Sequence, residues 1–119
     1  MRKKKLRVEV QSSDTGKWYS AEYESFLLSN EATKYVISVT KYTGDAGDAF
    51  NVVSKDKYVT NGMKFSTFDS DNDKYSGGNC AISIHGGWWY YECGTSRLNG
   101  CKEGSWGTYS SVARTCPNL

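Results

Sequence analysis

The sequence predicts an α+β fold with more strand than helix, in which an antiparallel sheet scaffold is followed by a loop-rich second half. No stretch keeps apolar residues at helical spacing for three turns, whereas alternating and β-branched runs recur up to Thr40. After Tyr58 the strand signal weakens and glycines interrupt the chain. With 119 residues, the sequence fits a single domain that is large enough to bury a core.

Three strands are expected in the first part of the chain. Leu6–Val10 alternates apolar and charged residues, as a half-buried strand does. Trp18–Leu28 is mostly extended, and Tyr35–Thr40 is rich in β-branched and aromatic residues. The side chains expected on one face of the second strand are those of Tyr19, Ala21 and Tyr23. Because short turns join these runs, we expect an antiparallel meander.

The chain changes character after the third strand. Residues 43–47 form a predicted loop, and Asp48 is expected to cap one helical turn that continues to Phe50. Glycines then occur at positions 62, 77, 78, 86, 87, 94, 100, 104 and 107. The first half is therefore interpreted as scaffold and the second half as a loop-built site, where binding function usually lies.

The net charge of +2 is unevenly distributed. Five of the 15 basic residues lie within residues 2–7, which leaves 10 basic against 13 acidic residues in the rest of the chain. A basic cluster can bind nucleic acid or anionic lipid. The body of the chain, however, has no basic stripe and no aromatics interleaved with Arg or Lys. A solvated terminus with no nucleic-acid partner is the preferred interpretation.

Four cysteines, Cys80, Cys93, Cys101 and Cys116, occur in a chain rich in Gly and Tyr. Their spacing contains no Cys-x-x-Cys pair and gives a zinc site little support. The composition favours an oxidising compartment. No apolar run follows the basic N-terminus, so the sequence predicts neither a signal peptide nor a membrane span.

Three aspartates alternate along one segment: Asp69, Asp71 and Asp73. A hard cation could recruit two of them and complete its roughly six to eight oxygen ligands from carbonyls and water. The segment is not an EF-hand, because Lys74 and Cys80 stand where that motif needs Gly and Glu. An Asn/Asp-rich turn with side chains bonded to their own backbone is the alternative. The residues alone leave both interpretations open.

One known family matches the order of three segments: residues 61–73, Asn79-Cys80-Ala81 and Gly86-Gly87-Trp88-Trp89-Tyr90. This order resembles the calcium-binding segment of fibrinogen-related domains, which form the C-terminal globes of fibrinogen chains, ficolins, tachylectins and angiopoietins. These are extracellular recognition modules, so the resemblance implies binding rather than catalysis, and a secreted protein. It runs from Leu6 to Gly100, and we expect a single partial domain over residues 1–119, with 101–119 as a diverged tail.

The resemblance also implies a calcium site and a disulfide. Its ligands would be the side chains of Asp71 and Asp73 and the carbonyls of Tyr75 and Gly77. The loop is one residue longer than in the family, so the carbonyl of Ser76 or Gly78 could substitute. The family disulfide corresponds to Cys80–Cys93, whereas Cys101 and Cys116 have no counterparts and are expected to be free or paired together.

Lectin-like members of the family hold an acetyl group next to the second cysteine of this disulfide. A histidine, the cysteine N–H and an aromatic residue nine positions earlier contribute to that pocket. Here Gly94 replaces the histidine and Ile84 stands at the aromatic position, so we expect weak binding of acetylated sugars. The candidate ligand-binding residues are Ile84, His85, Trp89, Tyr90, Glu92, Cys93 and Gly94. The alternative is that the aromatic residues in this loop only pack against the core and the loop and bind no ligand.

No catalytic arrangement stands out. His85 is the only histidine, and with Cys80 or Cys93 it would need a free thiol and an orienting residue. Asp45, Asp48 and Glu92 offer carboxylates, but their spacing gives no reason to pair them. The sequence therefore predicts a non-enzymatic, calcium-binding extracellular module for a glycan or protein ligand, with any oligomer formed through family segments absent here. The alternative is a truncated structural or interaction fragment without a functional pocket.

Overall fold

The computed structural model describes residues 4–51, 59–84, 86–93, 96–98, 105–106 and 109–110. Its strands are β1 (Lys4–Gln11), β2 (Trp18–Leu28), β3 (Ile37–Gly44), β4 (Ser96–Arg97), β5 (Ser105–Trp106) and β6 (Tyr109–Ser110). The helical elements are the 3₁₀ turn η1 (Glu31–Thr33) and the short helix α1 (Cys80–Ile84). The described part of the chain is thus rich in strand and poor in helix, as predicted. None of its helices is long and apolar enough to cross a membrane.

The three long strands form one antiparallel sheet in the order β1-β2-β3. Val8 lies opposite Ala21 in the first pair of strands, and Tyr23 lies opposite Tyr42 in the second. The predicted meander and the bounds of the second strand are confirmed. As expected, Ala21 and Tyr23 are buried and Tyr19 is partly buried.

The third strand begins later and ends later than the predicted range of Tyr35–Thr40. Lys34 and Tyr35 both have a positive φ, 65° and 54°, directly after η1. These left-handed residues turn the chain and exclude Tyr35 from an extended run. Asn30 caps the 3₁₀ turn by accepting a hydrogen bond from the Thr33 N–H. The β-branched pattern therefore predicted that a strand lies in this region. The left-handed turn before the strand determines the residue at which the strand begins.

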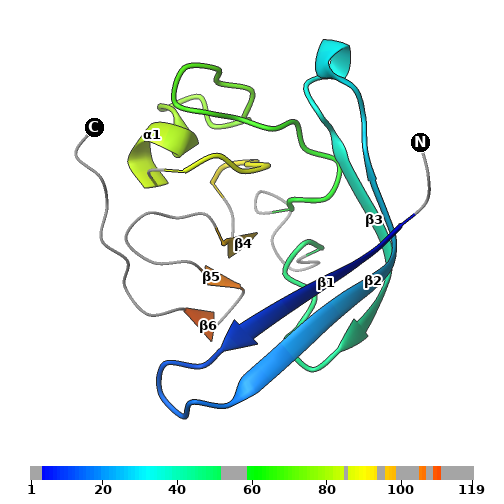
Figure 1. Ribbon diagram of the computed structural model, residues 1–119. Coiled ribbons are helices and arrows are strands. Elements are labelled where there is room, and N and C mark those ends of the chain that lie inside the picture. Colours follow the sequence, from blue (N-terminus) through cyan, green and yellow to red (C-terminus); the bar gives the residue numbers. More distant parts are fainter. Residues whose placement is uncertain are drawn as a thin grey trace.

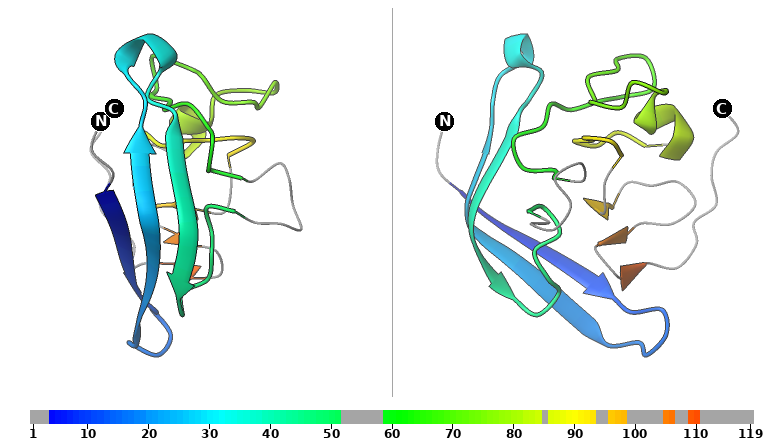
Figure 2. Two further views of the ribbon diagram at one scale, coloured as in Figure 1. Left: turned by 90° about the vertical axis from the view of Figure 1, so that its right-hand side faces the viewer. Right: turned by 180° about the vertical axis from the view of Figure 1, so that it is seen from behind.

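The second half of the described chain packs against one face of this sheet (Figure 1). It contains α1 and a smaller antiparallel sheet in the order β4-β5-β6, which the sequence did not predict. Viewed from the side and from behind, the large sheet forms one layer and the loops form the other (Figure 2). The loop-built half is thus supported by a continuous strand layer.

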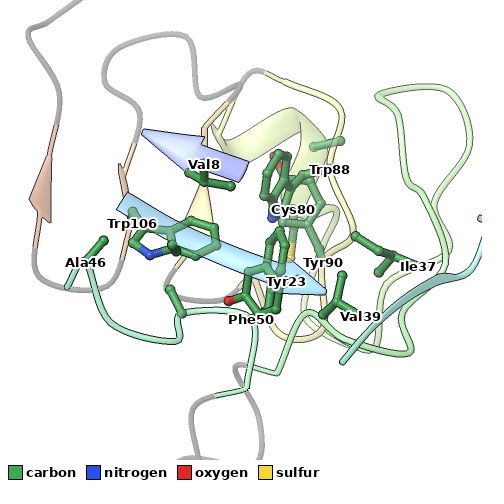
Figure 3. Close-up of a cluster of buried hydrophobic side chains, with 13 residues drawn as sticks. Val8, Tyr23, Ile37, Val39, Ala46, Phe50, Cys80, Trp88, Tyr90 and Trp106 are labelled. Atoms are coloured by element: carbon green, nitrogen blue, oxygen red, sulfur yellow. The ribbon is translucent and has the colours of Figure 1, made fainter. Parts of the chain in front are cut away.

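Aromatic rings fill the space between the two layers (Figure 3). The ring centroids of Tyr23 and Phe50 lie 5.1 Å apart, and those of Phe50 and Trp106 lie 4.7 Å apart. All three side chains are buried. The rest of the buried apolar core consists of Val8, Ala21, Ile37, Val39, Ala46, Ala49, Cys80, Ala81, Trp88 and Tyr90. Large rings from β2, the loop after β3 and β5 therefore join the layers.

Asp48 plays a different part from the helix cap that the sequence suggested. Residues 48–50 form a turn, not a helix, and the Tyr23 hydroxyl donates a 2.6 Å hydrogen bond to Oδ1 of Asp48. The Asn51 amide donates to the same carboxylate at 3.3 Å. The indole N–H of Trp106 donates to the Gly47 carbonyl at 2.8 Å. The carboxylate therefore anchors this loop beneath β2 rather than starting a helix.

Replacement of Tyr23 by Phe tests this anchor. Tyr23→Phe keeps the ring but removes a hydrogen bond to a partly buried carboxylate, so the free energy of unfolding should fall by about 1.5–3 kcal/mol. Tyr42→Phe is the matched control, because in the described part of the chain the Tyr42 hydroxyl accepts a hydrogen bond from the exposed Gly47 N–H and not from a buried group. It should lose less than about 1 kcal/mol. Urea denaturation monitored by tryptophan fluorescence measures both.

The same contact predicts the pH dependence. Burial, reinforced by the Asp48 hydrogen bond, raises the pKa of Tyr23 far above its usual 10.0. The folded state therefore binds this proton more tightly than the unfolded state does, and stability should fall as the pH rises above about 10. Burial also raises the pKa of Tyr90 to about 12, so Tyr23→Phe should retain a weaker alkaline loss. Equal losses of stability in the two proteins would contradict this assignment.

Candidate functional site

The acidic segment lies on a loop that is anchored to a neighbouring extended segment. Ser66 and Trp88 form an antiparallel bridge, with the Ser66 N–H donating to the Trp88 carbonyl at 2.9 Å. Further along, the Lys74 N–H donates to the Tyr91 carbonyl at 2.7 Å. Because both ends of the segment are bonded to residues 88–91, the aspartates between them occupy a loop with a defined path.

The three aspartates make different contacts. Oδ1 of Asp69 accepts from the Thr67 hydroxyl at 2.8 Å, and Oδ1 of Asp71 accepts from the Asp73 N–H at 3.2 Å. Asp73 accepts twice, from the Tyr75 N–H at Oδ1 and from the Cys80 N–H at Oδ2, both at 2.9 Å. The bonds at Asp71 and Asp73 are the local turn contacts that the sequence left as one of its two interpretations. Asp73 additionally connects the loop to the first residue of α1.

The carboxylates of Asp71 and Asp73 are close enough to repel each other. Burial is the main cause that raises the pKa of Asp73, and the adjacent Asp71 raises it further. The N–H groups of Cys80 and Tyr75 oppose this increase. Among the residues that the structure describes, no Lys or Arg forms an ion pair with either carboxylate. The pair thus carries negative charge that the described protein does not neutralise.

The described residues contain no group of three or more His, Cys, Asp or Glu side chains placed to hold a metal. A cation at Asp71 and Asp73 would consequently need backbone carbonyls and water for its other ligands. Tyr75 and Gly77 belong to the same loop, and the Tyr75 ring covers Gly77. A Cβ on Gly77 would come within 2.9 Å of that ring. Carboxylate and carbonyl oxygens are ligands of the kind that calcium accepts.

Cys80 and Cys93 are bonded to each other, as the family resemblance implied. Cys80 is fully buried at the start of α1, and Cys93 follows the aromatic segment. The bridge therefore connects the end of the acidic loop to the end of the segment that the loop pairs with. Cys101 and Cys116 lie outside the described residues, so their predicted state stays a prediction.

The short helix α1 was not predicted, although a signal for it exists. Oδ1 of Asn79 accepts from the Ile82 N–H at 3.3 Å, and the Asn79 carbonyl accepts from the Ser83 N–H at 3.1 Å. Asn is a favoured residue at the position before a helix, so Asn79 followed by Cys80 and Ala81 could have indicated it. The glycines on both sides concealed this single turn.

The structure separates the two aromatic candidates for ligand contact. Trp89 is partly exposed, its indole N–H donates to the Tyr35 carbonyl at 2.9 Å, and its ring lies 5.1 Å from that of Phe65. Tyr90 is fully buried, and its hydroxyl donates to the Gly86 carbonyl at 2.6 Å. Tyr90 therefore belongs to the core, and Trp89 with Phe65 supplies aromatic surface.

Phe65 was missed at the sequence level, but Gly87 is a signal for it. A Cβ on Gly87 would come within 2.8 Å of the Phe65 ring, so the ring uses space that only glycine leaves open.

Ile84 and Glu92 are partly buried, and Ile84 packs against the core. Cys93 has a positive φ of 68°, and the peptide bond before it is trans. The other two candidates, His85 and Gly94, lie outside the described residues.

Comparison with known proteins identifies the class of this domain. Residues 1–114 match the family model for the C-terminal globular domain of fibrinogen beta and gamma chains, and the chain belongs to this family. The match includes residues beyond Gly100, where the resemblance seen in the sequence ends.

Individual relatives show the same relationship. The human fibrinogen gamma chain is 41% identical over 91% of this chain, and human fibroleukin is 34% identical over 94%. The fibrinogen-like globe domain of human ANGPTL6 is 39% identical with a TM-score of 0.69 and covers 80% of this chain. Lamprey fibrin D-dimer, complexed with the peptide ligand Gly-His-Arg-Pro-amide, is 33% identical with a TM-score of 0.72 over the same share.

This chain matches only part of the length of each relative. The chain spans about a quarter of the length of these curated proteins, 25% of the gamma chain and 27% of fibroleukin. It covers 39% of the ANGPTL6 globe chain and 31% of the lamprey chain. The fold of the fibrinogen-like globe is thus shared over a limited portion of those proteins.

The disulfide is predicted to contribute a large part of the stability of the site. Cys93→Ser removes the bridge but keeps the Cys80 sulfur in the core, and it should lower the free energy of unfolding by about 3 kcal/mol. Non-reducing mass mapping should find the two peptides that contain Cys80 and Cys93 joined. A Cys80–Cys101 product, or a Cys93→Ser variant as stable as the parent, would contradict the assignment.

Proposed function

We propose that this chain is a calcium-stabilised recognition module of an extracellular protein, with a peptide or protein surface as its ligand. The observation that carries the proposal is the pair of carboxylates on Asp71 and Asp73. They lie side by side on a loop secured by the Cys80–Cys93 bridge, and no described basic residue neutralises them. Membership of the fibrinogen C-terminal family favours recognition over catalysis.

The side chains of Asp71 and Asp73 would hold the ion, together with the carbonyls of Tyr75 and Gly77 or those of Ser76 and Gly78. Bound calcium would supply positive charge to two carboxylates that otherwise repel each other. Because Asp73 also accepts the Cys80 N–H, ordering its carboxylate orders the connection between the loop and α1. The expected dissociation constant is on the order of 10⁻⁴ M or weaker, as in extracellular modules.

A peptide or protein ligand is supported by two observations. The lamprey fibrin relative was solved with a tetrapeptide amide ligand. In this chain, Gly94 and Ile84 stand where lectin-like members have acetyl-binding groups, whereas Trp89 and Phe65 offer partly exposed aromatic surface. Aromatic side chains are enriched at protein–protein interfaces. A glycan ligand is consequently the less favoured alternative.

An extracellular location agrees with the bonded cysteines. A disulfide between Cys80 and Cys93 persists in an oxidising compartment and is rare in the cytosol. The recognition surface and the cation site would then both act outside the cell, where calcium is abundant enough for a weak site to be filled.

Calcium should raise the melting temperature. At about 10 mM calcium, which is about 100 times a dissociation constant of 10⁻⁴ M, the stabilisation should reach about 2.7 kcal/mol. Asp71→Asn removes one charge of the pair while its Oδ1 can still accept the Asp73 N–H, and it should abolish the shift. Calorimetry with calcium and with excess chelator measures the effect.

Asp69→Asn is the matched control. It removes the same charge two positions earlier, from a carboxylate whose contact is the Thr67 hydroxyl, and it should keep most of the calcium shift. Magnesium at the same concentration should stabilise less, because it demands a tighter octahedral shell. No calcium dependence in the parent protein would leave the segment as an acidic turn and refute the proposal.

Binding experiments distinguish the two ligand classes. N-acetylglucosamine should not reach micromolar affinity, because the remaining Cys93 N–H contributes only about 1 kcal/mol of the roughly 8 kcal/mol needed. Gly94→His combined with Ile84→Phe should increase sugar affinity by restoring both groups. Isothermal titration with the sugar and with Gly-His-Arg-Pro-amide compares the classes directly. Micromolar sugar binding by the parent chain would show that the pocket lies elsewhere.

A further inference from the structure

Asn61 bonds to the edge of β3 with its side chain rather than as part of a strand. Its Oδ1 accepts from the Val39 N–H at 2.9 Å, and its Nδ2 donates to the Val39 carbonyl at 3.1 Å. The next residues continue this pairing with their backbone. The Gly62 N–H donates to the Ile37 carbonyl at 2.8 Å, and the Ile37 N–H donates to the Met63 carbonyl at 3.1 Å. The Asn61 amide thus takes the place of one peptide group along this edge.

The orientation of the Asn61 amide is fixed by hydrogen bonds that lead to Asp48. Nδ2 of Asn51 donates to both oxygens of that carboxylate at 3.3 Å, so its Oδ1 is free to face Asn61. This Oδ1 accepts from Nδ2 of Asn61 at 3.0 Å. Because a carboxylate only accepts and the Val39 N–H only donates, neither amide can be reversed without losing a bond. Position 61 therefore requires a side chain that accepts and donates at once.

The residue after Asn61 makes this amide chemically vulnerable. Gly62 has no Cβ to hinder its backbone nitrogen. That nitrogen can attack Cγ of Asn61, lose its proton and expel the side-chain nitrogen as ammonia, which closes a succinimide ring. Water then opens the ring at either carbonyl and leaves aspartate or isoaspartate at position 61. The net reaction consumes water, releases ammonia and needs no oxidant or reductant.

The fold opposes this attack at both reacting groups. The Gly62 N–H is bonded to the Ile37 carbonyl, and both polar atoms of the Asn61 amide are held by Val39 and Asn51. Ring closure requires the Gly62 nitrogen to leave Ile37 and the amide to leave the edge of β3. The segment must therefore open locally before it can react.

We propose that Asn61-Gly62 is a deamidation site that its pairing with β3 protects, and that deamidation prevents this pairing from forming again. Aspartate at position 61 places a charged oxygen against the Val39 carbonyl and Oδ1 of Asn51, which are both acceptors. Isoaspartate adds a methylene to the main chain between the N–H that donates to the Phe50 carbonyl at 3.1 Å and the N–H of Gly62. Either product makes a reversible local opening permanent.

Loss of these contacts affects the candidate site through the same segment of chain. A few residues further on, the Phe65 N–H donates to the Lys34 carbonyl at 2.9 Å. Ser66 then pairs with Trp88 at the base of the acidic loop. Deamidation at position 61 consequently loosens the support of this loop without changing any of its aspartates. This consequence does not depend on whether the loop binds calcium.

Peptide mapping by mass spectrometry tests the protection. The parent protein is kept in mildly alkaline buffer, either folded or in guanidinium chloride, and the mass increase at Asn61 is followed with time. Asn99-Gly100, the other Asn-Gly dipeptide of the sequence, calibrates the chemistry in the denatured sample. Deamidation of Asn61 should be at least about tenfold slower in the folded protein, because only the opened fraction reacts. Equal rates in the two samples overturn the proposal.

A pair of alanine variants tests whether the opening is local. Asn51→Ala removes an acceptor of the Asn61 amide and should accelerate deamidation of the folded protein about threefold or more. Asn79→Ala is the matched control. It removes two side-chain hydrogen bonds elsewhere, one to the Phe68 carbonyl and one from the Ile82 N–H, and should leave the rate unchanged. Equal acceleration by both variants would assign the reaction to global unfolding and overturn the proposal.

Asn61→Asp tests the effect of the product. Its unfolded fraction should increase about tenfold or more, which guanidinium denaturation measures as a lower midpoint. Asn30→Asp is the matched control, because it adds the same charge where Oδ1 already accepts from the Thr33 N–H, and it should be as stable as the parent. Failure of Asn61→Asp to fold while Asn30→Asp folds gives the same support. An Asn61→Asp protein as stable as the parent overturns the proposal.

Discussion

The hydrogen bond from the Tyr23 hydroxyl to the Asp48 carboxylate is the contact on which the arrangement of the two layers depends. It connects the middle strand of the sheet to the loop after β3, at 2.6 Å and with the tyrosine ring fully buried. Phe50 lies two residues after Asp48 and stacks on the same ring, and Trp106 closes the cluster from β5. A polar group buried among rings needs a partner, so the contact also selects one packing of this loop.

Packing against this core fixes the position of the candidate site. The Phe50 and Trp88 rings lie 6.1 Å apart, and Trp88 is the residue whose backbone pairs with Ser66 at the base of the acidic loop. Trp89, the next residue, turns outward to Phe65 and Tyr35. The buried Trp88 therefore fixes the position of this segment against the core, and the adjacent Trp89 lies at the surface as a result. A loop held in this way can bind without a helix or strand of its own, as recognition loops on rigid scaffolds do.

Local patterns in the sequence were sufficient for the sheet but not for the packing beneath it. The second strand was predicted to the residue, and the buried face of Ala21 and Tyr23 followed from alternation. The start of β3 was misplaced because two consecutive left-handed residues, Lys34 and Tyr35, carry no signal in side-chain chemistry. Asp48 was misassigned because its partner, Tyr23, lies 25 residues away in the sequence. Contacts at such separations are invisible to propensity and periodicity.

The site was predictable to a similar extent. The Cys80–Cys93 bridge and the family were identified from motif order, which long-range packing does not obscure. The exposure of Trp89 and the burial of Tyr90 were not predicted from the sequence. In a short irregular segment, the order of residues does not indicate which side chains face the core. The sequence also could not decide between an acidic turn and a cation site at Asp71 and Asp73, because the same carboxylates can serve in both. Side-chain oxygens that accept backbone N–H groups retain further lone pairs for a metal.

A calcium titration followed by backbone amide NMR tests the central claim most directly. If the acidic loop is a cation site, the amide signals of Asp73, Tyr75 and Cys80 should shift together and saturate, because all three N–H groups donate to the proposed ligand carboxylates. Signals from β1 and β2 should stay in place. Saturating shifts confined to another surface, or no shifts in this loop at millimolar calcium, would contradict the account.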